Sequence, residues 1–586
     1  MRSKCMSASI GSTGRKFVSV LCLVALAVST LPAQQAPAPT IRVTTHLVLV
    51  DVVATDKSGK PISGLKAEDF TVEEKGKKQK ITFFSSPAEA QQNNPPELGP
   101  GIYSNKPEFR SAGGPVTVLL LDAVNTPFKD QAYARLQMLK YVREQLKPGQ
   151  RIGVFTLANS LGVLQDFTSD PAVLLAALEK YRPQEQELQR AVGAPASEPL
   201  LGTGVTGLVF NNLVQITRAE ATEFQNVQVA YAIDRRIETT LAAMRSLARI
   251  LGGIPGRKEI IWLTAAFPFD LIPENRDMSE AELAATLPTI DARKTSVDVR
   301  AAGSYAASER GSHGAEIREV AALMSNAQVA IYPVDVRGLV SGMEFLREDT
   351  TRQSASTTDI AFVRLSDAAA SQQTMREIAA ETGGKPYVNQ NEIKNGVALA
   401  LADNAAAYTI GYYPEDKKWD GKFRTLNVKL NQKGVELRYR RGYYALDPSQ
   451  QKDRKPDQVL AEALRDAAPD TLVTFSAQVK PADKGKLGID YLVDPNSIST
   501  EDASGGKKLR FSYYAAELSP DGKIVQSRSQ KVDQTFKDDV YQQILQKGIL
   551  LHLDLDAPPN KNNQLRLAVQ DDRTGMVGTI NARLTQ

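Results

Sequence analysis

Residues 116–126 read VTVLLLDAVNT and place oxygen-bearing side chains directly after an apolar run. Asp122 follows this run, and Asn125 and Thr126 come within four positions of it. If the run is a buried strand, these side chains gather at its carboxyl end. Carboxylate, amide and hydroxyl oxygens are ligands that Mg²⁺ and Ca²⁺ take in proteins. The segment therefore raises the question of a cation site at this strand end.

Asp122 has two interpretations. It is either a ligand of a hard cation, whose open position a partner's carboxylate would complete, or a capping group that accepts backbone N–H groups of the following loop or helix. Asp335, which ends the apolar run VAIYPVD, has the same ambiguity, and we interpret it as a residue that bonds neighbouring backbone.

Other catalytic motifs are not recognisable. The histidines His46, His313 and His552 lie in three separate segments, so no shared histidine-based metal or hydrolase centre is expected. GLVSG at 338–342 does not fit the G-x-S-x-G nucleophile motif. GGIPGRK at 252–258 reads as a helix end followed by a strand start rather than as a P-loop.

The segment RYRRGYYA at 438–445 combines arginines and tyrosines that could form a binding strip. Neighbouring residues of a strand point to opposite faces, however. We therefore interpret Arg438, Arg440 and Arg441 as part of a solvated face beside a packed one.

The elements around Asp122 and Asp335 alternate between predicted strands and helices. Near-continuous apolar strands between amphipathic helices predict a parallel sheet that is covered on both faces. Two stretches, 183–231 and 266–313, lack a clear period, and we interpret them as insertions at the rim of the sheet. The predicted strands are 116–121, 258–264, 329–335 and 386–389, with a hairpin at 151–167; the predicted helices are 130–146, 235–251, 315–327, 371–384 and 392–405.

The flanking regions are predicted to be β structure. Residues 46–84 contain β-branched runs that are broken by DKSG and EKGKK turn signals. Two strand regions, 407–416 and 422–446, follow the last predicted helix. Strands are then spaced through 471–572, which predicts a C-terminal β-sandwich.

The first 33 residues have the order of a secretory signal peptide: basic residues, the apolar run FVSVLCLVALAV, then small residues ending at Ala33. They hold four of the 71 Lys and Arg and none of the 67 Asp and Glu, so the mature chain has no net formal charge. Nothing in this balance favours nucleic acid or anionic lipid as a partner. Both cysteines, Cys5 and Cys22, also lie in this segment, which leaves the mature chain without thiols or disulfides.

These patterns predict a multidomain protein of 586 residues: a central α/β parallel sheet (Rossmann-like) with helices on both faces, a small N-terminal β unit of immunoglobulin-like type, and a C-terminal β-sandwich. The predicted segments are a signal peptide at 1–33, a linker at 34–42, the N-terminal β unit at 43–86, a linker at 87–113, the α/β domain at 114–406, a β-hairpin extension at 407–447, a joint at 448–470 and the sandwich at 471–586.

The order of the central elements resembles that of the von Willebrand factor type A (VWA) domain. Several phrases are more narrowly similar to a VWA-related family described mainly from acidobacteria; these are VVATDKSGKPISGLKAEDFTV, VTVLLLDAVNTPFKDQAYAR, PGRKEIIWLT, VAIYPVDVRGL, TGG and YTIGYYP with RYRRGYYA. The resemblance covers roughly residues 43–447. It implies that ligands bind at the crest formed by the carboxyl ends of the strands, as in open α/β sheets generally.

Members of the VWA family with a working metal site use Asp-x-Ser-x-Ser, a later Thr and a later Asp. Asp122 matches the first Asp and Thr126 replaces the second Ser, but Val124 stands where the first Ser is expected. Ala265 and Ala266 follow IIWLT, so the later Asp is missing. Asn125 and Asp270 are candidate substitutes, and Thr203, Thr206 and Thr217 are candidates for the later Thr. We therefore expect a degenerate metal site and favour a metal-free crest, with Mg²⁺ or Ca²⁺ as the alternative.

The sequence thus favours an exported, non-enzymatic adhesion or scaffold protein that binds a protein partner through the crest, where Asn125 and Asp335 are candidate contact residues. No cofactor, nucleic acid or membrane span is expected for the mature chain, and its destination is the periplasm, the cell surface or the medium. Two alternatives stay open. One is an extracytoplasmic enzyme with its active site in the insertions or the C-terminal domain, and the other is a structural subunit of an envelope assembly. The partner and the oligomeric state are not predicted.

Overall fold

The computed structural model describes the chain from residue 47 to residue 582 with internal gaps. The described residues are 47–87, 97–110, 115–147, 149–184, 231–232, 234–266, 314–339, 357–404, 406–432, 434–446, 455–482, 485–557 and 563–582. The predicted signal peptide, nearly all of both predicted insertions, and the candidates Thr203, Thr206, Thr217, Asp270, His46 and His313 lie outside these residues.

The central sheet has five strands in the order β10-β9-β6-β7-β8. Their bounds are β6 (Val116–Asp122), β7 (Arg151–Leu157), β8 (Leu161–Thr168), β9 (Lys258–Thr264) and β10 (Val329–Asp335). Neighbouring strands are parallel except for β8, which pairs antiparallel with β7. The predicted parallel sheet is therefore confirmed as a mostly parallel one, and the hairpin predicted at 151–167 is its antiparallel edge.

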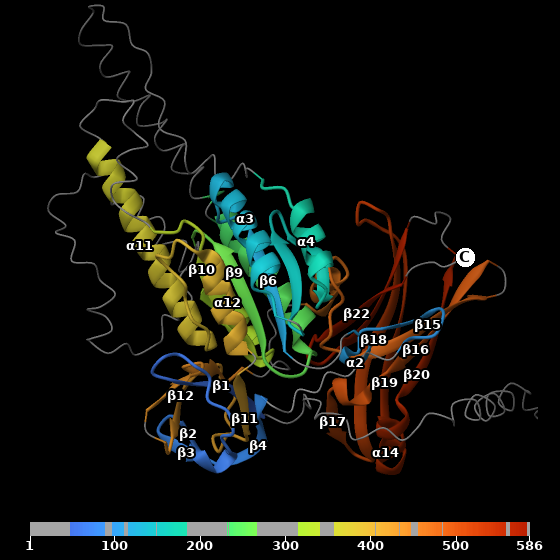
Figure 1. Ribbon diagram of the computed structural model, residues 1–586. Helices are drawn as coiled ribbons and strands as arrows, with labels where there is room; N and C mark the ends of the chain where they lie inside the picture. The colour runs from blue at the N-terminus through green and yellow to red at the C-terminus, as the bar shows by residue number, and fades with distance from the viewer. Residues whose placement is uncertain are drawn as a thin grey trace, which may run out of the picture. The chain divides into compact units, whose positions relative to one another are not determined.

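Helices cover both faces of this sheet (Figure 1). Strand side chains alternate between the faces, so Leu120 and Trp262 belong to one hydrophobic core while Leu121 and Leu263 belong to the other. The first core is completed by helical residues 234–252 with α9 (Gly314–Asn326) and α11 (Thr357–Thr382); the second by α3 (Phe128–Glu144), α4 (Pro171–Lys180) and α12 (Ile393–Asn404).

Two predictions for this region differ from the structure. Helix α11 begins at Thr357, whereas the sequence pattern predicted a start at 371. The segment 386–389 makes only an isolated bridge, between Tyr387 and Val334, instead of the predicted strand. A run of four residues is too short for its length to distinguish a full strand from an isolated bridge.

The N-terminal strands pair with strands that follow the α/β domain. The sheets have the orders β13-β1-β11-β4 and β14-β12-β2-β3, and they share one core that includes Val50, Phe70, Tyr408 and Val428. The predicted β unit and the predicted hairpin extension therefore form a single β unit. Its strands are β1 (Val48–Asp56), β2 (Phe70–Glu74), β3 (Lys77–Gln79), β4 (Ile81–Ser85), β11 (Ala407–Tyr412), β12 (Phe423–Leu430), β13 (Val435–Arg438) and β14 (Gly442–Tyr444).

The C-terminal region consists of two antiparallel sheets around one core that includes Phe475, Tyr491, Phe511 and Leu567. One sheet has the order β20-β16-β15-β5; the other has the order β17-β18-β21-β22, and β19 also pairs with β18. The strands are β5 (Ile102–Ser104), β15 (Phe475–Ala482), β16 (Lys486–Val493), β17 (Thr500–Ala503), β18 (Gly506–Leu518), β19 (Ile524–Phe536), β20 (Ile549–Asp556), β21 (Gln564–Asp571) and β22 (Val577–Ala582).

Two segments that the sequence pattern assigned to connections are ordered elements. β5 lies in the predicted linker at 87–113 and pairs with β15. α13 (Pro456–Ala463) lies in the predicted joint at 448–470. No helix among the described residues is long and apolar enough to cross a membrane.

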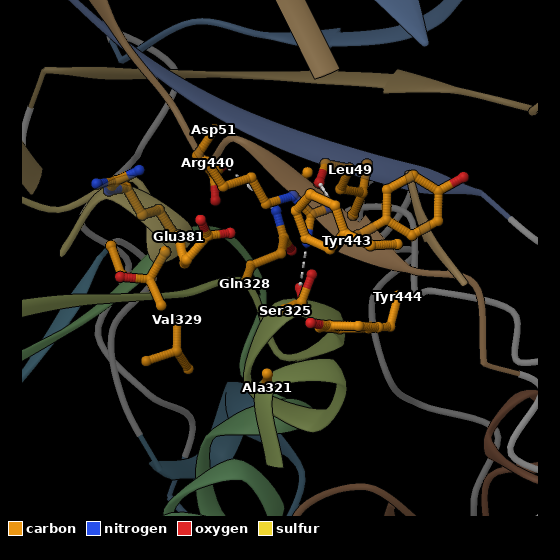
Figure 2. A pocket seen from close by; sticks show the side chains of 15 residues that line it. Leu49, Asp51, Ala321, Ser325, Gln328, Val329, Glu381, Arg440, Tyr443 and Tyr444 are labelled. Carbon is orange, nitrogen blue, oxygen red and sulfur yellow. Dashed lines mark hydrogen bonds between the residues drawn. The ribbon is translucent and has the colours of Figure 1, made fainter. Parts of the chain in front are cut away.

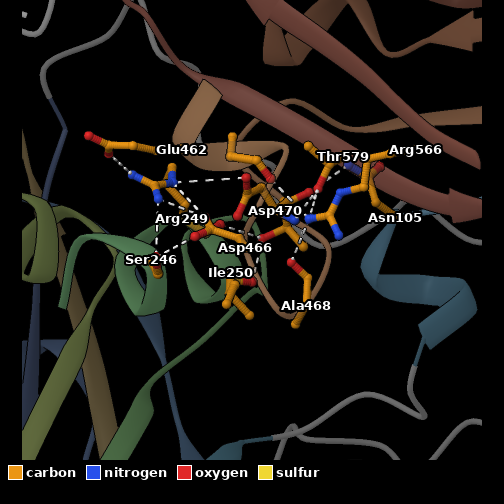
Figure 3. A network of polar contacts seen from close by, with 12 residues as sticks. Asn105, Ser246, Arg249, Ile250, Glu462, Asp466, Ala468, Asp470, Arg566 and Thr579 are labelled. Atoms are coloured by element: carbon orange, nitrogen blue, oxygen red, sulfur yellow. Dashed lines mark hydrogen bonds and ion pairs between the residues drawn. The ribbon is translucent and has the colours of Figure 1, made fainter. Parts of the chain in front are cut away.

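A buried ionic network joins the end of helical residues 234–252 to the segment after α13 (Figure 3). Arg249 donates to Asp466 Oδ2 from Nε at 2.9 Å and from NH2 at 2.7 Å, and its NH1 lies 3.3 Å from Glu462 Oε2. Asp470 is fully buried 3.9 Å from Arg249 Nε. Burial, together with nearby Asp466, raises the pKa of Asp470 well above its usual value.

The glycine pair at the end of this helix, Gly252 and Gly253, allows the two segments to approach each other closely. A Cβ on Gly253 would lie 1.9 Å from the backbone oxygen of Thr471, so no side chain fits there. The N–H of Gly253 donates to Thr471 Oγ1 at 2.9 Å. Gly253 therefore does more than end the helix, because it permits a contact with the C-terminal region.

Candidate functional site

Asp122 is the last residue of β6, at the carboxyl end of the central sheet. The chain leaves the strand through Ala123, whose N–H donates to the carbonyl of Leu157 at 2.7 Å, and Pro127 precedes α3. Asp122 and Thr126 are each 1% exposed and Asn125 is 3% exposed. The sequence-predicted candidates in this segment are thus brought together, but beneath the surface.

The carboxylate of Asp122 accepts hydrogen bonds from three residues. Asn125 donates its backbone N–H to Oδ1 and its side-chain Nδ2 to Oδ2, both at 2.9 Å. Trp262 Nε1 and Thr264 Oγ1 each lie 2.9 Å from Oδ2. Burial raises the pKa of Asp122, and these donors oppose the rise. The bond from the backbone of Asn125 is the contact that the capping interpretation requires.

A guanidinium group is the next neighbour in this network. Asn125 Oδ1 accepts from Arg236 Nε at 3.2 Å and from Arg236 NH2 at 3.1 Å. Thr240 Oγ1, which also lies on helical residues 234–252, is 3.2 Å from Asn125 Nδ2. Arg236 is half-buried, and burial of its guanidinium lowers its pKa, while the nearby Asp122 opposes this shift. The Asp122–Asn125–Arg236 network therefore links a buried carboxyl group to a guanidinium through one amide side chain.

These residues do not fit a hard cation. The groups around Asp122 are N–H and O–H donors whose hydrogens point at the carboxylate, and a cation needs oxygen lone pairs in their place. Val124 offers no side-chain oxygen, and Thr126 Oγ1 accepts the N–H of Ala265 at 3.2 Å. In the described part of the chain, no group of three or more His, Cys, Asp and Glu side chains is arranged to hold a metal ion.

Asp335, at the end of β10, is satisfied in a similar way. Its Oδ1 accepts from Arg337 Nε at 2.8 Å, and its Oδ2 accepts from Arg337 NH2 at 2.8 Å. The backbone N–H of Arg337 lies 3.1 Å from Oδ1, and Gln372 Nε2 of α11 donates to Oδ2 at 3.0 Å. With 1% exposure, Asp335 orders the loop after its strand, and Arg337 is its more exposed partner.

His552 is the one histidine among the described residues, and it lies on an exposed face of the C-terminal region. Its Nδ1 is 2.6 Å from Asp490 Oδ1 and its Nε2 is 3.1 Å from Asp554 Oδ1. The bond to Asp490 raises the pKa of His552 above its usual value, although partial burial opposes this rise. The ion pair of Lys480 with Asp490 places a third charge beside the imidazole. Both carboxylates thus serve as partners of cationic side chains.

The network partners of Asp122 were not predicted from the sequence. Trp262 and Thr264 stand two residues apart on β9, so they share one face of a strand that is adjacent to β6. This alternation was visible in the sequence and could have identified them as neighbours of Asp122. Arg236 had no such signal, because nothing in the local pattern places its helix next to the loop after β6.

Comparison with known proteins gives only distant structural similarity. No protein-family model matches the chain, and no curated protein matches it. An aerotolerance-related membrane protein from Bacteroides fragilis has a similar structure, with 14% identity and a TM-score of 0.20, over 50% of this chain and 99% of that chain. A von Willebrand factor type A protein from Catenulispora acidiphila has 9% identity and a TM-score of 0.18, over 89% of this chain and 75% of that one. Both TM-scores are too low to support an argument about function.

Proposed function

We propose that the chain is an exported, non-enzymatic interaction protein of the VWA-related type, which binds a protein partner through the crest of its central domain without a cation. The observation that supports this proposal is the Asp122–Asn125–Arg236 network. The oxygens of Asp122 are occupied by protein donors, and the half-buried guanidinium of Arg236 is the cationic group of the network. Ligands of open α/β sheets bind at this end of the strands.

Recognition by such a crest depends on shape, hydrogen bonding and the charge of Arg236. A guanidinium is a planar donor that suits a carboxylate of a partner. Asn125 holds the guanidinium through Oδ1, and Asp122 holds Asn125 in turn. Asp122 then acts as a positioning residue for Arg236 instead of contacting the partner.

The test is to capture partners from an envelope extract with the mature chain and to measure the affinity of the captured partner in EDTA and in Mg²⁺, Ca²⁺ or Mn²⁺. We expect equal affinity in all of these conditions. Arg236→Gln should weaken binding by about tenfold, since a charge-assisted hydrogen bond is lost. The matched control is Arg235→Gln, because Arg235 is exposed and forms an ion pair with Glu238 at 3.2 Å, and binding should not change.

Three results would contradict the proposal. The first is loss of the partner in EDTA and its return with a divalent cation. The second is calorimetric heat on adding Mg²⁺, Ca²⁺ or Mn²⁺ to the wild type but not to Asp122→Asn. The third is turnover of ester, glycoside or peptide substrates by the mature chain at enzyme-like rates, which would replace the interaction function with catalysis.

A further inference from the structure

A cavity of about 50 Å³ lies at the amino end of the central sheet, beside strands β1 and β14 of the β unit. Figure 2 shows Leu49, Asp51, Arg440 and Tyr443 from the β unit on one side and Ser325 of α9 on another. Arg257, directly before β9, also lines it. The cavity is independent of the crest, which is formed by the opposite ends of the same strands.

Arg440 enters the cavity wall from the connection between β13 and β14. Its NH1 donates to the carbonyl of Ser325 at 3.1 Å and its NH2 to the carbonyl of Leu49 at 2.7 Å. The guanidinium also stacks 5.6 Å from the ring centre of Tyr443. Its Nε has no hydrogen-bond partner in the described structure. The expectation that Arg440 lies on a solvated face is therefore wrong, because the β unit and α9 enclose it.

Arg257 is the second buried guanidinium of this cavity, at 5% exposure. Its NH2 donates to the hydroxyl of Tyr332 and to the carbonyl of Gly383, each at 3.0 Å. Its Nε, like that of Arg440, is buried and lacks a partner in the described structure. The hydrogen bonds of both arginines thus go to neutral oxygens, and neither charge is met by a bonded carboxylate.

The acidic side chains that line the cavity are engaged with other groups. Asp51 Oδ1 accepts from Thr409 Oγ1 at 2.6 Å and lies 3.3 Å from Gln328 Nε2. Glu381 lies 4.0 Å from Arg441 NH1. Burying a charge without a bonded counter-charge is costly. The two guanidiniums therefore leave this cavity suited to an anion.

We propose that this cavity binds a small planar oxyanion of the carboxylate class, such as formate or acetate. Three buried donors without partners among the described residues surround the space, namely Arg257 Nε, Arg440 Nε and Ser325 Oγ. Since a water needs about 10–15 Å³, the volume suits an anion of three or four heavy atoms. Bound there, the anion bridges the β unit and the α/β domain through Arg440 and Arg257.

The test is thermal unfolding and calorimetry of the mature chain with sodium formate, acetate, bicarbonate, phosphate or chloride at constant ionic strength. We expect formate or acetate to raise the Tm, because a ligand that binds only the folded state stabilises it. Bicarbonate tests whether an inorganic planar oxyanion binds as well, whereas phosphate and chloride should not shift the Tm. Arg440→Lys, which keeps the charge but removes Nε–H, should lower the affinity for the anion by about tenfold or more.

Ser325→Ala serves as the milder variant if Arg440→Lys does not fold. It should lower the affinity for the anion measurably, because one donor is lost. Arg441→Lys is the matched control, because this neighbouring guanidinium is half-exposed and should not affect the anion. The proposal is overturned if neither formate nor acetate raises the Tm or releases heat, which would leave water as the occupant. It also fails if bicarbonate alone binds, or if Ser325→Ala binds formate and acetate as the wild type does.

Discussion

The two ends of the central sheet treat buried charge differently. At the carboxyl end, Asp122 and Asp335 are each surrounded by donors from within the α/β domain. At the amino end, Arg257 directly precedes β9, and Lys258 and Glu259 begin it; all three are buried. Arg257 there lines a cavity shared with the β unit, and Arg249 bonds to Asp466 of the C-terminal region. The crest is thus electrostatically self-contained, whereas the base depends on the flanking regions.

This difference shows that a segment rich in oxygen-bearing side chains is not the same as a segment whose buried polar groups lack hydrogen-bond partners. The DAVNT segment has the residue types of a cation site, yet its polar groups are occupied. The segment 252–258, which reads as a helix end and a strand start, holds a buried donor, Arg257 Nε, that has no partner in the described structure. Buried polar groups that lack partners are costly, and they therefore mark where a missing ligand would stabilise the protein.

The largest effect is expected at the base, from Arg249→Met. The variant removes the cation from a buried pair and leaves the carboxylate of Asp466 without it, which costs about 3–5 kcal/mol. Unfolding followed by Trp262 fluorescence in a Trp419→Phe background should show this loss, because these are the two tryptophans of the chain. Hydrogen exchange should rise both in helical residues 234–252 and around residues 466–473.

Glu462→Gln is the control for this variant, since Glu462 pairs with the same arginine but its side chain is 40% exposed. It should cost less than about 1 kcal/mol. If Arg249→Met increased exchange only in the α/β domain, the base would be as self-contained as the crest and the contrast between them would disappear.

At the crest, Asp122→Ala should destabilise by about 3 kcal/mol, because it removes the acceptor of several buried donors at once. The exchange of amides near residues 122–126 and 262–266 should increase, while that of the C-terminal region should stay unchanged. Asp170→Ala provides the comparison: Asp170 is an exposed N-cap that accepts the N–H of Ala172 at 2.8 Å, and its loss costs about 1 kcal/mol. Equal destabilisation by the two variants would show that the network around Asp122 adds nothing beyond a cap.

Much of the central fold could be predicted because its information is local. The apolar run before Asp122 and the helical stripes around it have the periods of a buried strand and of amphipathic helices. The pairing of β1 with β11 could not be predicted, because Val50 and Ile410 meet across the whole α/β domain. β5 was missed for the same reason: three residues in a polar, proline-rich segment become a strand only beside β15.

The residues of the candidate site likewise fall into those that local sequence predicts and those that only tertiary packing places. Asp122, Asn125 and Thr126 were predicted as neighbours, since they are adjacent in the sequence and the strand end positions them. Arg236 and Arg440 were not predicted as members of any site, because their roles depend on which element packs beside them. Composition identifies an arginine as polar, but only tertiary packing decides that its charge is buried.

Measured across a single pH unit, the smallest expected effect concerns Glu259 at the base. Burial raises the pKa of Glu259 from 4.5 to about 8, while Thr117 donates to its Oε1 at 2.8 Å. Between these two values the folded state holds a proton that the unfolded state has released. Stability from this group is therefore full below pH 4.5 and is lost as the pH rises through the folded pKa, by up to about 1.4 kcal/mol per pH unit.

Glu259→Gln keeps an acceptor for Thr117 and removes the titrating group. The free energy of unfolding of the variant should therefore increase relative to that of the wild type as the pH rises. Chemical denaturation of both proteins between about pH 5 and pH 6, at least about one unit below the pKa of Lys258, measures this. Burial lowers the pKa of Lys258 to about 7, so this lysine is protonated in both states within that window and does not contribute. Parallel stability curves for the two proteins would mean that Glu259 is ionised in the fold. The amino end of the sheet would then hold a full negative charge near Arg257, which would weaken the case for an anion in the cavity that Arg257 lines.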